Sequence, residues 1–359
     1  MINDKPKALK IDDIAAAAGV SKATVSRYLN GRRELLSEKT WARIAQVVEA
    51  TNYRPSDIAS NLKKKQRNIV GVLISDISSP FSSALISGIT KYLDERGYSV
   101  LIADSANDPE KEAENIRSLR SRGVCGLLVN TASYNNPHLI QVAREGVPVI
   151  LMDRDVQGYS FDLVTSDHAA GMHTLVAYLH TQGYTRLALF TQPWEDNSVR
   201  TARRKAFLRS AAEFRSCRPD VYVIIDEEPG QSAQAQLEQF LHSLRPGEVP
   251  AIVGINSITT VCAAQAIAAC SLAMPEQIGL CGPEDWDWHN ELNWPCMIRP
   301  NVTTVKIHST ELGSQSAAVL LNRLQDSTLP QQTRIIPCEL ALRDSACRRN
   351  TDEFSGVLP

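Results

Sequence analysis

From residue 68 onward, short apolar runs alternate with amphipathic segments of helical periodicity, and this pattern restricts the fold more than any other feature. Segments such as residues 82–97, 108–123 and 167–183 lie between the runs. Apolar strands that alternate with helices are typical of parallel sheets covered by helices on both faces. The ten predicted strands are residues 68–75, 98–105, 124–130, 147–153, 162–166, 186–191, 221–226, 251–255, 278–282 and 301–307.

Ten strands are too many for one doubly wound domain, and the 359 residues are enough for two or three compact units. We therefore predict an α/β region of two similar, doubly wound lobes with a cleft between them. Ligands of such sheets bind at the carboxyl ends of the strands. The cleft is thus the expected place for a small molecule.

The N-terminal part has a different pattern. Three short helices are predicted at residues 11–19, 21–31 and 37–53, with Ser21 and Ser37 as N-caps of the second and third. A turn of about three residues separates the first two helices, which is typical of helix-turn-helix units. We therefore predict a small, all-α head.

Charge is divided unevenly between these two parts. Residues 1–67 carry 14 lysines and arginines against 7 aspartates and glutamates, whereas the remainder carries 24 against 33. The head therefore has a net charge of +7 and the remainder a net charge of −9. A folded, basic head predicts a polyanionic partner such as nucleic acid.

The second predicted helix combines hydroxyl side chains with two cations, Lys22 and Arg27. The major groove of double-stranded DNA admits one helix, in which Ser and Thr can bind phosphates and Lys and Arg can contact guanine edges. An ordinary solvated helix would show the same composition. The basic charge of the head, the short preceding turn and the basic linker that follows favour DNA binding.

Four segments follow from these patterns. We expect a helix-turn-helix DNA-binding domain at residues 8–55, a hinge or linker at 56–67, the two-lobed region at 68–343 and a polar tail at 344–359. The linker has too few apolar residues to be stable alone, so it should order only against something else. The tail lacks leucine heptads, so nothing predicts a tetramerising coil.

Several classes of protein lack support in the sequence. No apolar run approaches the roughly 20 residues of a membrane span, and the polar start lacks a signal peptide, so we expect a cytoplasmic protein without membrane contact. The eight cysteines form no C-x-x-C pair and the seven histidines no H-E-x-x-H motif, which predicts reduced thiols and no metal site. Without a P-loop, a G-x-G-x-x-G or a G-x-S-x-G motif, neither a cofactor nor an enzymatic activity is expected.

Residues 11–31 (IDDIAAAAGVSKATVSRYLNG) and 53–81 (YRPSDIASNLKKKQRNIVGVLISDISSPF) closely resemble the lac repressor/purine repressor family of bacterial transcription regulators. The resemblance covers the chain from about residue 9 to about residue 343. It implies a periplasmic-binding-protein-like core and a homodimer on a roughly palindromic DNA operator. It also implies an effector, a small molecule bound in the cleft.

The resemblance assigns DNA-binding positions in the head and the linker. Lys22, Ala23 and Arg27 would read bases. The hydroxyls and amide that would hold phosphates belong to Ser21, Thr24, Ser26 and Asn30. In the linker, which folds into a hinge helix in the family, Leu62 would wedge into the minor groove with Ala59 packed nearby; alternatively, Leu62 covers the core lobe.

The resemblance also assigns effector-binding positions. These are Phe81, Asp153, Arg200, Arg203, Asn256, Glu284, Asp285 and Trp286. Three departures from the family pattern stand near them. Ala206 replaces a glycine, Ser257 replaces an aspartate, and Glu284 stands where the family has an aspartate, which would reshape one side of the pocket.

Two arginines near the cleft favour a carboxylate ligand, because a guanidinium binds a carboxylate in a bidentate way. Trp286 and Trp288 would offer an aromatic face to a sugar ring, although packing alone would also explain Trp288. Residues 192–200 and 280–288 are similar to family members that sense ketogluconate or keto-deoxygluconate. A sugar acid, with 2-ketogluconate as the first candidate inducer, is therefore expected; a neutral sugar or a purine-type corepressor is the alternative.

Two other classes share parts of this pattern. A solute-binding protein of a transporter would have the two-lobed core, but it would need an export signal and would not use a basic head. An enzyme could use the acidic and basic side chains of the cleft, but ligand recognition needs the same groups. The sign of the effector response stays open, because sugar-sensing relatives usually lose DNA on binding and purine-type relatives gain it.

Overall fold

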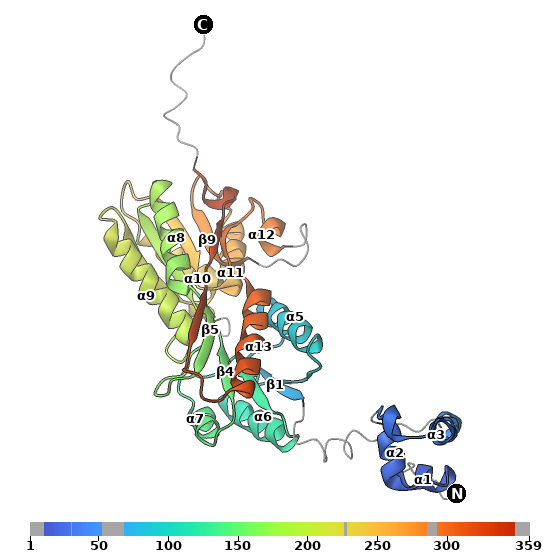
Figure 1. The fold of residues 1–359 in the computed structure, drawn as a ribbon. Helices are drawn as coiled ribbons and strands as arrows, with labels where there is room; N and C mark the ends of the chain where they lie inside the picture. The colour runs from blue at the N-terminus through green and yellow to red at the C-terminus, as the bar shows by residue number, and fades with distance from the viewer. Residues whose placement is uncertain (1–10, 30, 52–67, 226–227, 286–292, 349–359) are drawn as a thin grey trace, which may run out of the picture. The chain divides into compact units, whose positions relative to one another are not determined.

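The computed structural model describes residues 11–29, 31–51, 68–225, 228–285 and 293–348 (Figure 1). The chain divides into two compact units, residues 1–67 and residues 68–359. The predicted functional positions that lie outside the described residues are Asn30, Ala59, Leu62, Trp286 and Trp288.

The first unit contains the three expected helices. They are α1 (Ile11–Ala17), α2 (Lys22–Leu29) and α3 (Glu38–Thr51), with a 3₁₀ turn η1 (Arg33–Leu35) before α3. Their apolar faces enclose a small core of Ile14, Ala15, Ala18, Val25 and Ile44. Within the described residues, the helix-turn-helix prediction is confirmed.

Local chemistry fixes the ends of these helices. Gly19 has a φ of +60°, a conformation that glycine adopts at little cost, and it turns the chain between α1 and α2. The Ser21 Oγ accepts the Thr24 amide at 3.2 Å, and the Ser37 Oγ accepts the Thr40 amide at 3.3 Å. Both predicted N-caps are therefore confirmed.

The second unit begins with lobe 1, which is built on a six-stranded parallel sheet in the order β11-β5-β4-β3-β1-β2. Its strands are β1 (Ile69–Ile74), β2 (Ser99–Asp104), β3 (Gly126–Val129), β4 (Val149–Met152), β5 (Asp162–Ser166) and β11 (Thr333–Ile336). Its helices are α5 (Pro80–Asp94), α6 (Pro109–Ser121), α7 (Pro137–Arg144) and α13 (Ser309–Gln325). Branched apolar side chains of the central strands are fully buried, which fits a sheet covered on both faces.

Lobe 2 repeats this plan in the order β12-β10-β9-β8-β6-β7, with β12 antiparallel to β10 and the other pairs parallel. Its strands are β6 (Arg186–Thr191), β7 (Arg218–Val223), β8 (Pro250–Gly254), β9 (Gly279–Asp285), β10 (Thr303–Lys306) and β12 (Glu339–Ala341). Its helical segments are α8 (His168–Thr181), α9 (Ser198–Glu213), η2 (Pro229–Gln231), α10 (Ala233–His242), α11 (Ser257–Ala269), α12 (Trp294–Met297) and η3 (Asp344–Ala346).

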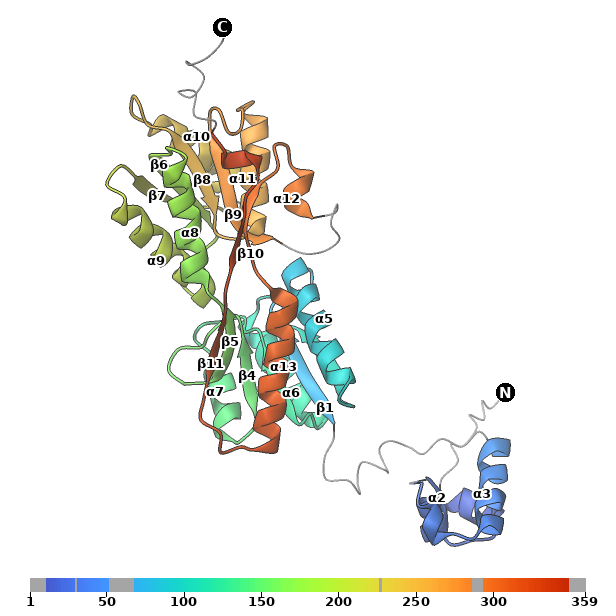
Figure 2. The same ribbon diagram turned by 45° about the horizontal axis from the view of Figure 1, so that its top comes forward.

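The chain passes between the lobes at three places: from β5 to α8, from β10 to α13 and from β11 to β12 (Figure 2). All ten predicted strands are present, although β7 begins at Arg218 rather than at residue 221. The edge strands β11 and β12 were not predicted. They have four and three residues and mostly half-exposed or exposed side chains, so they lack the buried apolar pattern of the other strands.

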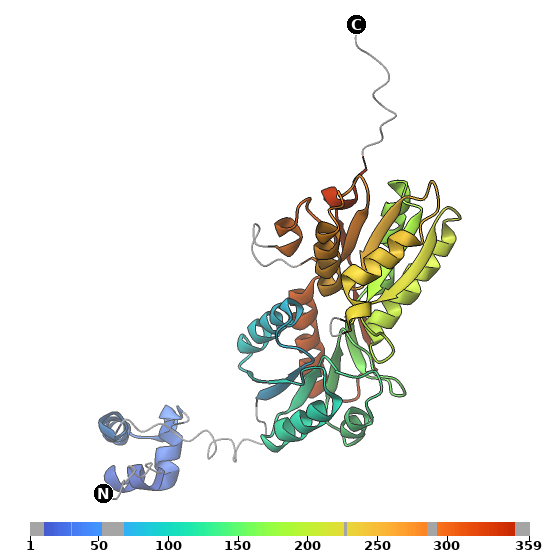
Figure 3. The ribbon, with the colours of Figure 1, turned by 180° about the vertical axis from the view of Figure 1, so that it is seen from behind.

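Helices α5 and α13, far apart in the sequence, lie side by side on lobe 1 (Figure 3). A Cβ added at Gly88 would meet the Thr310 carbonyl oxygen, and one added at Gly313 would meet the Leu85 carbonyl oxygen. The two glycines therefore allow the helix backbones to touch. This contact fixes α5, whose first turn carries Phe81.

No helix among the described residues is long and apolar enough to cross a membrane. All eight cysteines lie in described segments and none forms a disulfide; Cys281 is buried and Cys347 is exposed. The described residues also contain no group of three acidic, histidine or cysteine side chains placed to hold a metal ion.

Candidate functional site

A cavity of about 130 Å³ lies between the two lobes, where carboxyl ends of strands from both sheets meet. Lobe 1 contributes the segments after β1, β2, β3 and β4, and lobe 2 contributes those after β6 and β8 together with the end of β9. This is the position expected from the strand–helix alternation. The lining includes six of the eight predicted effector residues: Phe81, Asp153, Arg200, Arg203, Asn256 and Glu284.

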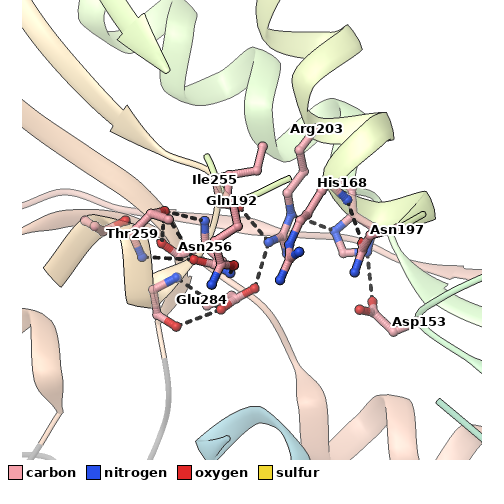
Figure 4. Close-up of polar contacts among 12 residues, drawn as sticks. Asp153, His168, Gln192, Asn197, Arg203, Ile255, Asn256, Thr259 and Glu284 are labelled. Atoms are coloured by element: carbon pink, nitrogen blue, oxygen red, sulfur yellow. Dashed lines mark hydrogen bonds and ion pairs between the residues drawn. The ribbon is translucent and has the colours of Figure 1, made fainter. Parts of the chain in front are cut away.

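Arg203 and Glu284 form the central ion pair of the cavity wall (Figure 4). The Arg203 Nη1 donates to the Glu284 Oε1 at 2.7 Å and to the Ile255 carbonyl oxygen at 2.9 Å. The Glu284 Oε2 accepts the Ser257 hydroxyl at 2.8 Å and the Ser257 amide at 3.1 Å. Burial opposes ionisation of Glu284, but Arg203 and Ser257 outweigh it and lower the pKa of this carboxyl below its ordinary value.

Asp153 of lobe 1 is hydrogen-bonded to His168, the first residue of α8 in lobe 2 (Figure 4). The His168 Nε2 lies 2.8 Å from the Asp153 Oδ1, and the Arg203 Nε donates to the His168 Nδ1 at 3.3 Å. Burial opposes ionisation of Asp153, but His168, Arg203 and Arg154 outweigh it, so the pKa of Asp153 lies below its ordinary value. Asp153 and Glu284 are therefore both anionic at neutral pH.

Two further arginines, Arg154 and Arg200, line the cavity without forming a direct ion pair among the described residues, although nearby carboxylates attract both. The Arg154 Nη1 donates to the Asn107 Oδ1 at 3.2 Å and to the Thr131 carbonyl oxygen at 3.0 Å. The Arg200 Nη1 donates to the Pro193 carbonyl oxygen at 2.9 Å. Burial, followed by repulsion from Arg154, lowers the pKa of Arg200 to about 10. Two half-buried cations thus face one small space and repel each other.

Amide side chains complete the wall. The Asn130 Nδ2 donates to the Met152 carbonyl oxygen at 2.8 Å, and its Oδ1 accepts the Ser75 hydroxyl at 2.6 Å. On lobe 2 the Asn256 Nδ2 donates to the Gln192 Oε1 at 2.9 Å, while the Asn256 Oδ1 caps α11. These bonds fix the amides before any ligand arrives.

Two of the acidic residues that line the cavity, Asp153 and Glu284, also share an unusual backbone conformation. Asp153 has a φ of +66° and Glu284 a φ of +76°, in the left-handed region that non-glycine residues rarely adopt. Such strain is concentrated at functional sites. Each lobe therefore presents one strained carboxylate at the end of a central strand.

Asp285, in contrast, does not line the cavity. Its side chain is buried, and the Oδ2 accepts bonds from the Arg343 Nη2 at 2.6 Å and the Thr304 Oγ1 at 2.7 Å. Neighbouring residues of a strand point to opposite faces, so Glu284 can face the cavity only if Asp285 faces away. The expectation that both line the effector site is corrected here: Asp285 anchors β9 instead.

On the head, α2 exposes Lys22, Ala23 and Arg27. The Lys22 Nζ forms an ion pair with the Asp12 Oδ2 of α1 at 2.9 Å. The hydroxyls of Ser21 and Thr24 lie 2.8 Å apart and are hydrogen-bonded to each other. The exposed surface of α2 therefore combines two cations with one small apolar side chain.

Both units match known families. Residues 10–56 match the model of bacterial regulatory proteins of the lacI family, and residues 67–344 match that of periplasmic binding proteins and the sugar binding domain of the LacI family. The chain belongs to the LacI family. Members of this family are transcription regulators rather than enzymes, so the protein is a ligand-responsive transcription regulator and the enzyme alternative is set aside.

Individual LacI-family relatives match over nearly the whole chain. The HTH-type transcriptional regulator KdgR of Bacillus subtilis (strain 168) is 31% identical over 336 residues, 93% of this chain and 97% of KdgR. The HTH-type transcriptional regulator PtxS of Pseudomonas plecoglossicida is 32% identical over 340 residues, 95% of this chain and 96% of PtxS. The crystal structure of the lac repressor dimer bound to operator and the anti-inducer ONPF has a TM-score of 0.77 at 24% identity, covering 95% of this chain and 99% of that one.

Sequence reasoning missed several residues of the wall in this LacI-family core. Arg154 and Gln192 follow predicted strands and Asn130 ends one, so the rule that ligands bind at carboxyl ends of strands could have found them. Asn197 precedes α9 and caps it. The strand-end rule could not have found His168, because this residue begins a helix. It contacts Asp153 and Arg203 of the wall without lining the cavity itself.

Proposed function

We propose that this LacI-family regulator binds a palindromic DNA operator as a homodimer and responds to a small sugar acid between its lobes. The first candidate is 2-ketogluconate, acting as an inducer that lowers the affinity for DNA. A neutral sugar or a purine-type corepressor is the alternative that the experiments below are designed to separate.

The observation that carries the effector class is the pair Arg154 and Arg200. Both side chains line the cavity, neither forms a direct ion pair among the described residues, and their mutual repulsion contributes to the lowered pKa of Arg200. A ligand carboxylate between them would remove this repulsion and accept charge-assisted hydrogen bonds from both. Arg203 is less suited to this role, because Glu284 already neutralises it.

The rest of the wall suits a polyhydroxylated chain. Asp153 and Glu284 are anionic and can accept hydrogen bonds from hydroxyls, while Asn256 offers an amide and Phe81 an apolar face. The volume of about 130 Å³ is well below the roughly 300–1,000 Å³ of pockets for drug-sized ligands. Both features support a compound of monosaccharide size.

For the operator, we assign base contacts to the exposed residues Lys22, Ala23 and Arg27. Ala23 can offer only apolar contact, for instance to a thymine methyl. Phosphate contacts are assigned to Ser21, Thr24, Ser26 and Asn30, and minor-groove contacts to Ala59 and Leu62. One head of this size contacts few base pairs, so useful specificity needs two heads on a palindrome.

Effector control follows from the three connections between the lobes. A ligand changes an equilibrium only if it binds the two lobe arrangements with different affinity. An acid held by Arg154 of lobe 1 and Arg200 of lobe 2 contacts both lobes, so its binding depends on their closure. A change in lobe closure would then move lobe 1 in each subunit, and this movement would alter the distance between the two linkers of the dimer.

Thermal shift and calorimetry on the purified protein test the effector class. The panel contains 2-ketogluconate, keto-deoxygluconate, gluconate, glucose, ribose, guanine and hypoxanthine. We expect a raised melting temperature with at least one acid and none with the neutral compounds, because a ligand that binds only the folded state stabilises it. Stabilisation by a neutral sugar or a purine alone would contradict the sugar-acid proposal.

Selection of duplexes from a random library, followed by mobility shift, tests the operator and the dimer. We expect a palindromic consensus, a complex with two chains per duplex and weaker binding when the effector acid is added. Failure to retain any duplex at low ionic strength would sink the DNA proposal. A stronger complex with ligand would instead identify a corepressor.

A further inference from the structure

His168 joins the two lobes behind the cavity wall. It follows Asp167, the N-cap of α8, on the segment that leads from β5 of lobe 1 into lobe 2. Only about 7% of its side chain is exposed, and its two ring nitrogens contact Asp153 and Arg203. His168 does not line the cavity between the lobes, so its effect on a ligand must pass through these two neighbours.

The hydrogen bonds define the state of the ring. The Arg203 Nε carries a hydrogen and has no acceptor capacity, so the His168 Nδ1 at 3.3 Å must be the acceptor and carry no proton. The remaining ring hydrogen then lies on Nε2, which donates to the Asp153 Oδ1 at 2.8 Å. The contacts therefore require a neutral imidazole, protonated on Nε2 alone.

We propose that His168 is a positioning residue for the effector, whose neutral ring links Asp153 of lobe 1 to Arg203 of lobe 2, so that protonation of this ring weakens effector binding. The inference rests on the proposed function, since it assumes that the effector contacts these two residues. It adds to that function a link between the carboxylate of one lobe and the guanidinium of the other.

Protonation of the His168 ring changes its contact with Arg203 but not its contact with Asp153. A proton on Nδ1 would place a second donor and a second positive charge against the Arg203 Nε, so Arg203 would have to turn away. The bond to Asp153 would remain, because Nε2 stays a donor. The chain from Asp153 through His168 to Arg203 and Glu284 would then break within lobe 2, between His168 and Arg203, and Arg203 would lose its position in the cavity wall.

A cavity and several charged groups surround the His168 ring. His168 lines a second cavity of about 380 Å³, which shares Asp153 and Val199 with the effector cavity. The charged and titratable groups that surround the ring, from all the elements packed against it, are Tyr134, Asp153, Asp155, Asp167, Arg203, Lys205, Glu284 and Cys338. Four carboxylates and two cations surround the ring, so the effect of its protonation on Arg203 depends on the direct contact between the His168 Nδ1 and the Arg203 Nε.

Calorimetry with 2-ketogluconate on the full chain tests the proposal at about pH 7.5 and about pH 5.5, on either side of the usual range of histidine titration. We expect the wild-type Kd to rise about tenfold at the lower pH, because a hydrogen bond to a charged group is lost. His168→Gln, which keeps a neutral donor and acceptor, should bind with a nearly pH-independent Kd. His168→Leu should bind about tenfold or more weakly at both pH values.

His173→Gln is the matched control, because His173 lies on the same helix with about 44% of its side chain exposed and bonds to Ser210 rather than to the wall. It should keep the wild-type Kd and its pH dependence. An unchanged Kd and an unchanged pH profile in His168→Leu would overturn the proposal.

The tautomer provides a test that needs no ligand. Nitrogen NMR of the full chain with ¹⁵N-labelled histidine, assigned with His168→Gln, should give an unprotonated Nδ1 and a protonated Nε2 at about pH 7.5. A proton on Nδ1 at that pH would overturn the proposal. If no sugar acid binds the wild-type protein, the sugar-acid proposal fails. The NMR spectrum then decides by itself whether His168 has the neutral ring, protonated on Nε2, that the inference requires.

Discussion

The guanidinium of Arg203 and the carboxylate of Glu284, 81 positions apart in the chain, lie 2.7 Å from each other in the wall between the lobes. Arg203 is only about 3% exposed and Glu284 about 16%. Arg203→Met should therefore destabilise the free protein by about 3–5 kcal/mol, because it leaves a buried carboxylate without its partner. Urea unfolding measures this loss.

Two variants make that measurement specific. Arg209→Met removes an exposed arginine from the same helix and should change the free energy of unfolding by less than about 0.5 kcal/mol. The double variant Arg203→Met/Glu284→Gln should lose less stability than the sum of the two single losses, because no unpaired charge remains buried. Additive losses would mean that the pair contributes nothing as a pair.

The same carboxylates make stability depend on pH. The pKa values of Asp153 and Glu284 lie below their ordinary values of 3.8 and 4.5, since nearby cations outweigh burial. The stability that they contribute is present above those ordinary values and is lost as the pH falls through the lowered ones. Between about pH 5 and pH 3, Glu284→Gln should therefore lose less stability than the wild type.

Denaturant unfolding at several pH values checks this slope. Glu276→Gln, at an exposed position of the same lobe, should keep the wild-type slope. If Glu284→Gln lost as much stability at low pH as the wild type, the pKa of Glu284 would be the same in the folded and the unfolded protein.

Arg154 and Arg200 should behave differently from Arg203. Arg154→Met and Arg200→Met should each raise the Kd for 2-ketogluconate about 10–100-fold, because each removes a charge-assisted bond. Neither should destabilise the free protein as Arg203→Met does, since neither has an ion-pair partner among the described residues. Calorimetry and unfolding on the same samples separate the two effects, and Arg209→Met again serves as the control.

An unchanged Kd in both arginine variants would remove the support for a carboxylate ligand. Arg200→Lys adds detail, because lysine keeps the charge but not the planar fork of guanidinium donors. It should bind the acid with an intermediate Kd.

Much of this architecture could be predicted because it depends on local patterns. Buried parallel strands are continuous apolar runs, and all ten were found from that signal. β11 and β12 could not be found in this way, because the short segments 333–336 and 339–341 gain their structure by adding to the edges of existing sheets. Without β11 and β12, the sequence could not show the complete sheet of each lobe or the third connection between the lobes.

The site was predicted less completely, and for a physical reason. The strand-end rule identifies where ligands bind, but not which charges already neutralise each other. The pairing of Arg203 with Glu284 and of Asp153 with His168 arises from tertiary contacts across many residues, and it leaves Arg154 and Arg200 as the cations available to a ligand. For Asp285, in contrast, a local rule is sufficient. Side chains alternate along a strand, so Glu284 and Asp285 of β9 cannot both face the cavity.

The helix pair α5 and α13 gives a prediction on packing. Gly88→Ala would place a methyl group against the Thr310 carbonyl oxygen, so the helices must separate. Overpacking of this kind costs about 1–3 kcal/mol, and more where the obstacle is backbone. Gly230→Ala, whose methyl group would meet no atom within 4 Å, is the matched control and should keep the wild-type melting temperature.

The head gives the last prediction. Lys22 is exposed on α2 and paired with Asp12 in the free protein. Lys22→Met should weaken operator binding and reduce the slope of log affinity against log salt by about 1 per head, because one phosphate-neutralising or base-reading cation is lost. Asp12→Asn should strengthen binding, since it frees Lys22 and removes a negative charge near the phosphates. Fluorescence anisotropy over a salt series measures both, with Lys111→Met on the exposed surface of α6 as the control. Equal salt slopes for Lys22→Met and the wild type would exclude Lys22 from the interface.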